Sequence, residues 1–312
     1  MRVLRTALAP LLALSLLGTS VGIAVAGAAT TAPSHASSLP TIIIGNEGFG
    51  ESYIMQDIYA DLLTNAGFKV SLLAQATTSR ADEIPALEHG SVDLVPDYAG
   101  SLLVYLAAND QKQAGSVTTA VAAANTILAK KGAAVLPGTV GLDQNVFVVT
   151  AATKAKDHLS TLSSIKAYAS KWVFGAPSEC STYYFCLPGL KSVYGLKFKQ
   201  VKSFDESGPL TVTALKSGAA QIVELFSTDS VISADKFFQL TDNKNLEPAD
   251  HLVPVIRSTF DTAAVRSALA SVNSDLTTSV LTQLDTALSG STHPTPAAVA
   301  EGFLVQEHLI KG

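Results

Sequence analysis

The sequence predicts an α/β protein of two lobes, in which each lobe is a mostly parallel sheet flanked by helices. Short apolar runs rich in β-branched residues alternate with stretches of helical spacing, an order typical of parallel sheets covered by helices. The alternation starts at residue 41 and starts again near residue 150, without an obvious repeat in the sequence itself. Because open parallel sheets bind ligands at the polar loops that follow their strands, two such units predict a cleft shared between the lobes.

The first unit begins with residues 41–44, Thr-Ile-Ile-Ile, a β-branched run of the kind found in buried strands. Residues 54–63 then keep apolar side chains at helical spacing, and Gly67 follows where helices commonly end. The other elements up to the restart are predicted as strands at 69–73, 92–94, 135–136 and 145–150 and as helices at 80–89 and 113–131.

The second unit repeats the alternation of helix and strand. Its elements are predicted as helices at 160–170, 189–194 and 210–218 and as strands at 172–174, 199–202 and 220–225. Two amphipathic segments, 263–288 and 297–310, are predicted to be helices that end the chain.

The N-terminal segment has the composition of a secretory signal peptide. Two arginines precede an almost wholly apolar stretch, and Ala24-Val25-Ala26 supplies the small residues that a signal peptidase needs. We therefore predict a signal peptide at 1–26, a linker at 27–39, and an exported protein that is periplasmic or extracellular and associated with the cell surface. A retained membrane anchor is the alternative, because about 20 apolar residues can span a bilayer.

Composition and motifs exclude several classes of function. The formal net charge is −5 and no basic stripe is interleaved with aromatic residues, so we expect no nucleic-acid partner. The glycines of residues 45–50 follow a GxxGxG pattern instead of the dinucleotide-binding GxGxxG, and we expect no cofactor. The hydroxyl groups of residues 181–183 have no general base marked beside them, so we expect no enzyme. An exported enzyme on a similar scaffold is the alternative.

The two cysteines, Cys180 and Cys186, both lie in the predicted exported part of the chain. With five residues between them, they fit a disulfide that pins a local loop in an oxidising compartment. The competing interpretation is a metal site on two thiolates. It has no neighbouring His or second Cys pair in the sequence, and we expect no metal.

The segment around Tyr98 combines a strand that ends in Asp97 and Tyr98 with a small-residue helix start. This order places an aromatic ring at the edge of the predicted cleft. Taken alone, the pattern favours Tyr98 as a buried packing residue whose hydroxyl is hydrogen-bonded.

An ordered set of short motifs extends from residue 41 to about residue 260. They are Ile-Gly-Asn-Glu-Gly-Phe-Gly at 44–50, Asp-Tyr-Ala-Gly at 97–100, Leu-Pro-Gly-Leu at 187–190, Gly-Pro-Leu-Thr at 208–211, Ser-Thr-Asp at 227–229 and Pro-Val-Ile-Arg at 254–257. In this order they resemble the glycine betaine/choline-binding proteins of osmoprotectant ABC importers.

The resemblance implies a type II periplasmic-binding-protein fold in which the chain crosses twice between the lobes. Mapped onto this sequence, residues 40–144 and 250–312 form one lobe and residues 145–249 form the other. A small-molecule ligand is expected to bind between the lobes and to favour the closed form. The implied protein is a monomer that delivers its ligand to an ABC permease in the membrane.

In betaine-binding members of this family, aromatic rings surround a quaternary ammonium and basic residues hold the carboxylate. By position, Tyr98, Phe147 and Phe226 match rings of this cage, and Ser101 matches a hydroxyl that contacts the carboxylate. The resemblance implies a ligand pocket formed by Glu47, Tyr98, Ser101, Asn145, Phe147, Tyr183, Tyr184, Phe226, Thr228 and Asp250.

Two departures from the family pattern change the expected ligand. Glu47 stands where betaine binders carry a Lys, and Tyr183 or Tyr184 stands about where they carry an Arg. Without these cations a ligand carboxylate has no charge partner, and burying it unpaired costs several kcal/mol. We therefore expect a choline-like quaternary ammonium or amine, with a polyol or another polar solute as the alternative. Tyr183 and Tyr184 fit either the cleft or a packing position beneath the cysteine loop.

Overall fold

The structure is a computed structural model that describes residues 40–74, 79–108 and 116–311. The predicted signal peptide, its alternative as a membrane anchor, and the predicted linker lie outside the described residues. No helix in the described ranges is both long and apolar enough to cross a membrane.

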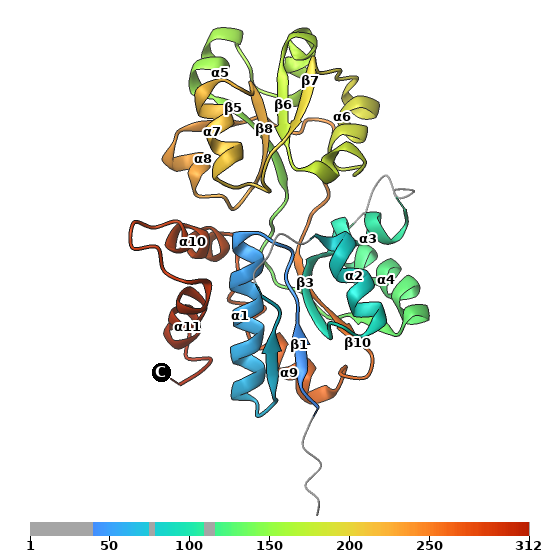
Figure 1. The fold of residues 1–312 in the computed structure, drawn as a ribbon. Coiled ribbons are helices and arrows are strands. Elements are labelled where there is room, and N and C mark those ends of the chain that lie inside the picture. The colour runs from blue at the N-terminus through green and yellow to red at the C-terminus, as the bar shows by residue number, and fades with distance from the viewer. Residues whose placement is uncertain (1–39, 75–78, 109–115, 312) are drawn as a thin grey trace, which may run out of the picture. The chain divides into compact units, whose positions relative to one another are not determined.

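Two five-stranded sheets confirm the predicted α/β class and the two-lobed fold (Figure 1). The first has the order β2-β1-β3-β10-β4, with strands Ile42–Ile44 (β1), Val70–Leu72 (β2), Leu94–Tyr98 (β3), Ala133–Val135 (β4) and Leu252–Arg257 (β10). The second has the order β7-β6-β8-β5-β9, with strands Asn145–Thr150 (β5), Val173–Ala176 (β6), Gln200–Ser203 (β7), Ile222–Phe226 (β8) and Phe237–Gln239 (β9).

One strand in each sheet runs against its neighbours. β10 is antiparallel to both β3 and β4, and β5 is antiparallel to both β8 and β9. The other pairings are parallel, so the carboxyl ends of several strands meet at one edge of each sheet. The loops that follow these ends carry the candidate site.

Helices cover both sheets. Those that accompany the first sheet are Gly50–Asn65 (α1), Arg80–His89 (α2), Ala99–Leu106 (α3), Val117–Leu128 (α4), Ala263–Ala270 (α9), Thr278–Leu288 (α10) and Pro296–Gln306 (α11). Those that accompany the second are Ala151–Asp157 (α5), Leu187–Tyr194 (α6), Pro209–Ser217 (α7) and Val231–Ala234 (α8). Short 3₁₀ helices follow α4 at Ala129–Lys131 and occupy Leu162–Ala167, Ala169–Lys171 and Ser178–Ser181.

Helix α1 is buried over most of its length and packs against α11 and β2. Its buried Gln56 donates hydrogen bonds from Nε2 to the carbonyl oxygens of Ile44 (2.8 Å) and Leu73 (3.0 Å), which fixes the helix to the ends of β1 and β2. The helix ends two residues before Gly67, whose φ of 90° lies in the left-handed region that glycine adopts at low cost. This anchoring sets the position of Glu51 in the first turn of α1.

Local polar side chains explain where the prediction of secondary structure was wrong. The predicted helix at 160–170 is instead two short 3₁₀ helices, and Thr161 and Ser164 bond each other's backbone in a capping box where the first begins. The single helix predicted at 263–288 is interrupted between α9 and α10. There, Thr277 caps α10 by accepting a hydrogen bond from the backbone N–H of Val280.

Candidate ligand-binding site

A cavity of about 810 Å³, part of it open to solvent, lies where residues from both sheets converge. Its lining follows the carboxyl ends of β1, β2 and β3 in one sheet and of β6, β7 and β8 in the other. This is the location expected for a ligand site on open parallel sheets, and the volume suits a small molecule.

Most of the residues predicted for the pocket line this cavity. They are Glu47, Tyr98, Ser101, Asn145, Tyr183, Phe226 and Asp250. These residues come from segments that are widely separated along the chain, and the motifs at 44–50 and 97–100 contribute to the lining directly.

Three predicted residues do not line the cavity. Phe147 is buried in the hydrophobic core against Phe174, because it lies two residues further into β5 than the lining residue Asn145. Tyr184 packs its ring edge-on against Phe185 beside the cysteine loop. Thr228 is buried behind the cavity wall.

Arg80 is a basic residue that sequence reasoning missed, and it overturns the expectation that the cavity contains no cation. It is the first residue of α2, with its side chain 17% exposed on the cavity wall. Its guanidinium forms ion pairs with Asp97 (Nη2–Oδ1, 2.7 Å) and Glu47 (Nη2–Oε2, 3.2 Å). A cation is unfavourable in the first turn of a helix, and an Arg at this position was the available signal of a special role.

Carboxyl groups dominate the cavity wall. Those that line it are Glu47, Asp143, Glu179, Glu206, Glu224 and Asp250. Within the described residues, Arg80 is the only Lys, Arg or His on the wall, and two carboxylates already bind it. The cavity therefore has a large excess of acidic over basic groups.

Burial raises the pKa of five of these groups, Glu47, Asp143, Glu206, Glu224 and Asp250. It raises the pKa of Asp250 to about 6, that of Asp143 to about 7, and that of Glu206 to about 8. Burial is also the main cause of the raised pKa of Glu47, which the Arg80 charge partly opposes. Without a ligand, these carboxyl groups therefore keep their protons to a higher pH than they do in water.

Asp250 fixes the start of α3. Its Oδ1 accepts hydrogen bonds from the backbone N–H groups of Gly100 (2.6 Å) and Ser101 (3.2 Å), and its Oδ2 accepts one from the Ser101 hydroxyl. The Ser101 hydroxyl therefore binds a protein carboxyl group, where the family pattern implied a ligand carboxylate. The pair adds another acidic group to the wall and no free donor.

Aromatic rings form the apolar part of the wall. Phe49 stacks on Tyr98 with 6.2 Å between ring centroids and packs against Phe226 at 4.9 Å. The Tyr98 hydroxyl donates a hydrogen bond to Glu51, and the buried Tyr183 hydroxyl makes no hydrogen bond of ordinary geometry to the described residues. Aromatic faces beside carboxyl groups attract organic cations.

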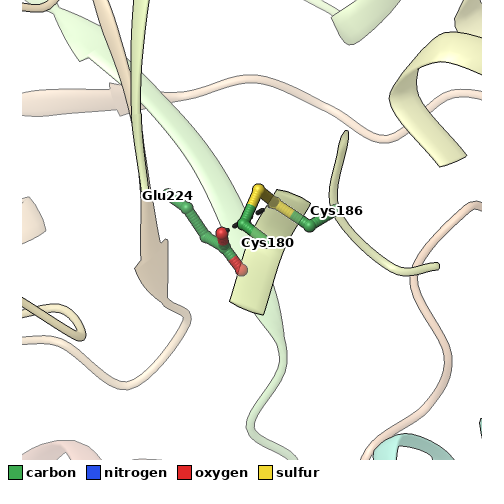
Figure 2. A group of neighbouring side chains, drawn as sticks. All are labelled: Cys180, Cys186 and Glu224. Atoms are coloured by element: carbon green, nitrogen blue, oxygen red, sulfur yellow. Dashed lines mark hydrogen bonds between the residues drawn. A yellow bond between two sulfur atoms is a disulfide. The ribbon is translucent and has the colours of Figure 1, made fainter. Parts of the chain in front are cut away.

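Figure 2 shows the Cys180–Cys186 disulfide beside Glu224 of β8. Glu224 Oε2 lies 2.9 Å from Cys186 Sγ, and Cys180 also lines the cavity. Burial raises the pKa of Glu224, and a disulfide sulfur carries no hydrogen, so only a protonated carboxyl group can donate a hydrogen bond in this contact. These three side chains lie close enough to bind one metal ion, but a disulfide offers no thiolate ligand.

Comparison with known proteins agrees with this geometry. Residues 40–306 match the family described as the substrate binding domain of ABC-type glycine betaine transport systems. None of the curated protein sequences compared with this chain matches it.

Several solved structures share the fold. A glycine betaine/carnitine/choline ABC transporter structure has a TM-score of 0.67 and 22% identity, over 86% of this chain and 99% of that one. A choline-binding protein of an ABC transporter, in complex with choline, has a TM-score of 0.64 and 12% identity over 86% and 89%. Lactococcal OpuAC, closed on glycine betaine, has a TM-score of 0.60 and 13% identity over 86% and 96%. With the family match over residues 40–306, the chain belongs to the substrate-binding domains of ABC-type glycine betaine transport systems and is a substrate-binding protein of an ABC importer.

Proposed function

We propose that this substrate-binding protein captures a small organic cation that carries no carboxylate, such as choline or another amine. One observation carries the proposal: the cavity wall has many carboxyl groups and one guanidinium, and that guanidinium is already paired. A positive ligand supplies the charge that the wall lacks, and the rings of Phe49, Tyr98 and Phe226 offer faces for it.

A ligand carboxylate fits this cavity poorly. To bind Arg80 it has to displace Glu47 or Asp97, which leaves a buried carboxylate without its partner. It also approaches the uncompensated acids Asp143 and Glu206. The same trimethylammonium head should therefore bind better with a hydroxyl tail than with a carboxylate tail.

The remaining features of the proposal follow from the family and the sequence. The protein acts as an exported monomer, periplasmic or extracellular, whose two lobes are residues 40–144 with 250–312 and residues 145–249. Glu47, Tyr98, Asn145, Tyr183, Phe226 and Asp250 form the ligand-facing wall. The loaded protein docks on an ABC permease, and no bond in the ligand is made or broken.

The test compares three ligands of nearly equal shape by calorimetric titration of the oxidised protein. Choline carries a positive charge, 3,3-dimethylbutan-1-ol is its uncharged isostere, and glycine betaine adds a carboxylate. We expect choline to bind about tenfold or more tightly than either of the others, because each change removes or opposes one close ion pair. Three outcomes would overturn the proposal. They are equal binding of the uncharged isostere, tighter binding of glycine betaine, and a polyol as the only ligand that binds.

A matched pair of variants locates the effect. Glu206→Gln removes a carboxyl group from the wall, and Glu301→Gln removes one from the exposed face of α11. We expect Glu206→Gln to weaken choline binding about tenfold and Glu301→Gln to leave it unchanged. Equal effects would show that the overall negative charge of the protein, and not the cavity wall, attracts the cation.

A further inference from the structure

A second cavity adjoins the first. It encloses about 980 Å³, part of it open to solvent, and it shares the side chains of Phe49, Glu206 and Phe226 with the first cavity. Its other walls come from the first turn of α1, the start of α7 and the end of α10. The proposed choline-sized ligand does not account for this space.

The second cavity is also acidic. Glu51, Glu206, Asp229 and Asp285 line it, and no Lys, Arg or His of the described residues does. Glu51 is only 3% exposed, and its Oε2 has no hydrogen-bond partner within the described part of the chain. Its other oxygen accepts the Tyr98 hydroxyl, so Glu51, which lines this cavity, has one buried carboxyl oxygen without a donor.

The acids behind this wall repel one another. Burial, followed by the charges of Asp143 and Asp285, raises the pKa of Glu51. The buried Thr228 hydroxyl lies near enough to Glu51, Asp143 and Asp285 to lower the pKa of each, yet it makes no hydrogen bond of ordinary geometry. Free carboxyl oxygens accept hydrogen bonds from N–H groups, which a primary ammonium has and a quaternary ammonium lacks.

An apolar boundary separates the two acidic spaces. Phe49 and Phe226 line both cavities, and their ring centroids are 4.9 Å apart at an interplanar angle of 48°. Apolar rings flanked on both sides by carboxyl groups match an alkyl chain with an amino group at each end.

We propose that the ligand is an elongated organic dication of the diamine or polyamine class, with one amino group in each cavity and its alkyl chain against Phe49 and Phe226. The inference rests on the proposed function and narrows the ligand from any small organic cation to one with two positive charges. Arg80 and the carboxylates that bind it stay in place, and the unpaired acids of both cavities hold the two amino groups.

The experiment titrates the oxidised protein with a series of α,ω-diamines, from 1,3-diaminopropane to 1,8-diaminooctane, and with the monoamine of each chain length. At one length or more, the diamine should bind about tenfold or more tightly than its monoamine, the factor expected for a second charge-assisted contact. Monoamines and choline that bind as tightly as every diamine would overturn this inference and leave the proposed function standing. Binding of no cation at all would overturn both.

Two variants test whether the second cavity causes the preference. Asp285→Asn removes a charge from it, and Ser289→Trp fills its exposed rim without changing charge. Each should reduce the diamine-to-monoamine ratio of affinities to about one, Ser289→Trp should leave choline affinity unchanged, and Glu301→Gln should change neither quantity. A diamine preference that persists in both variants, or an equal loss of choline binding, would place the second charge elsewhere and overturn the inference.

Discussion

Two groups of buried carboxyl groups beside the ligand cavity differ in one respect. Glu47 and Asp97 share the guanidinium of Arg80, which forms ion pairs with both. The charges of Asp143 and Asp285 add to the raised pKa of Glu51, the charge of Asp143 adds to that of Asp285, and no cation pairs with any of the three in the described part of the chain. The protein thus supplies an internal cation to the first group and leaves the second to protons or to a ligand.

This contrast indicates which buried acids determine the ligand selectivity of a binding protein. A carboxylate paired inside the protein is satisfied before the ligand arrives and contributes little to choosing it. Ionising a buried acid that has no ion-pair partner is unfavourable in the free protein. A cationic ligand relieves this cost when it binds, so the acid favours cations over other ligands. Removing the cation of the first group should therefore lower the stability of the protein, whereas neutralising an acid of the second group should raise it.

The largest expected effect follows removal of the shared cation. Arg80→Gln leaves Asp97, which is fully buried, without its ion-pair partner. We expect the free energy of unfolding to fall by about 3–5 kcal/mol at neutral pH, the usual cost of breaking a buried pair from one side. Denaturant unfolding followed by circular dichroism measures it.

The control for this variant is Lys131→Gln, which removes the cation of the exposed pair with Glu88. Exposed pairs contribute about 0–1 kcal/mol, so this change should have little effect. Equal losses in the two variants would show that Arg80 contributes no more than a surface charge.

A smaller effect is expected from pH alone. The folded protein raises the pKa of Asp250 to about 6, of Asp143 to about 7 and of Glu206 to about 8, so between about pH 4 and pH 8 it holds more protons than the unfolded chain. Stability should therefore fall as pH rises through this window, by about 1.4 kcal/mol for each pKa unit by which folding raises the pKa of an acid that ionises. Thermal unfolding at pH 5 and pH 8 measures the change.

A bound cation should flatten that dependence, because it stabilises the ionised acids. A free protein that is more stable at pH 8 than at pH 5 would contradict the assignment of these acids as unpaired. A saturating amine that leaves the slope unchanged would show that it binds away from them.

The smallest expected effect is a gain in stability. Asp285→Asn removes one member of the group without a cation, whose pKa burial and the neighbouring acids raise well above its ordinary value. The variant should be more stable than the parent by about 1 kcal/mol at pH 8, where the unfolded chain is ionised, and equal to it near pH 4. Thermal unfolding at both pH values tests the sign, and a loss of stability at pH 8 would contradict it.

Many helices and strands could be predicted because local patterns of apolar residues indicate them. The β-branched run at 41–44 and the helical spacing at 54–63 correspond to β1 and α1, since burial imposes both patterns on the sequence. The break between α9 and α10 was missed, because the capping side chain of Thr277 lies within a continuous amphipathic pattern. Strand β9 was also missed, and its pairing with β5 is a contact between segments distant in the sequence.

The sequence could predict several residues that line the site, but it could not predict how the charged groups of the site pair with one another. Matching positions in the family placed Tyr98, Asn145 and Phe226 at one cavity, whereas the partners of Arg80, Glu47 after β1 and Asp97 in β3, are brought to it only in the folded chain. Glu224 did offer a signal. It is an acidic residue inside the otherwise apolar strand Ile222–Phe226, and burying a charge there without a special role is costly.

The place of β10 has a consequence for how the chain acquires its structure. β10 lies between β3 and β4, yet the whole second sheet separates it from them along the chain. A polypeptide that emerges with its N-terminus first can complete the second sheet while the edge of β3 still has no neighbour. Refolding should accordingly show hydrogen-exchange protection in β5 to β9 before it appears in β3 and β4, and truncation ahead of residue 252 should leave the first sheet unable to form.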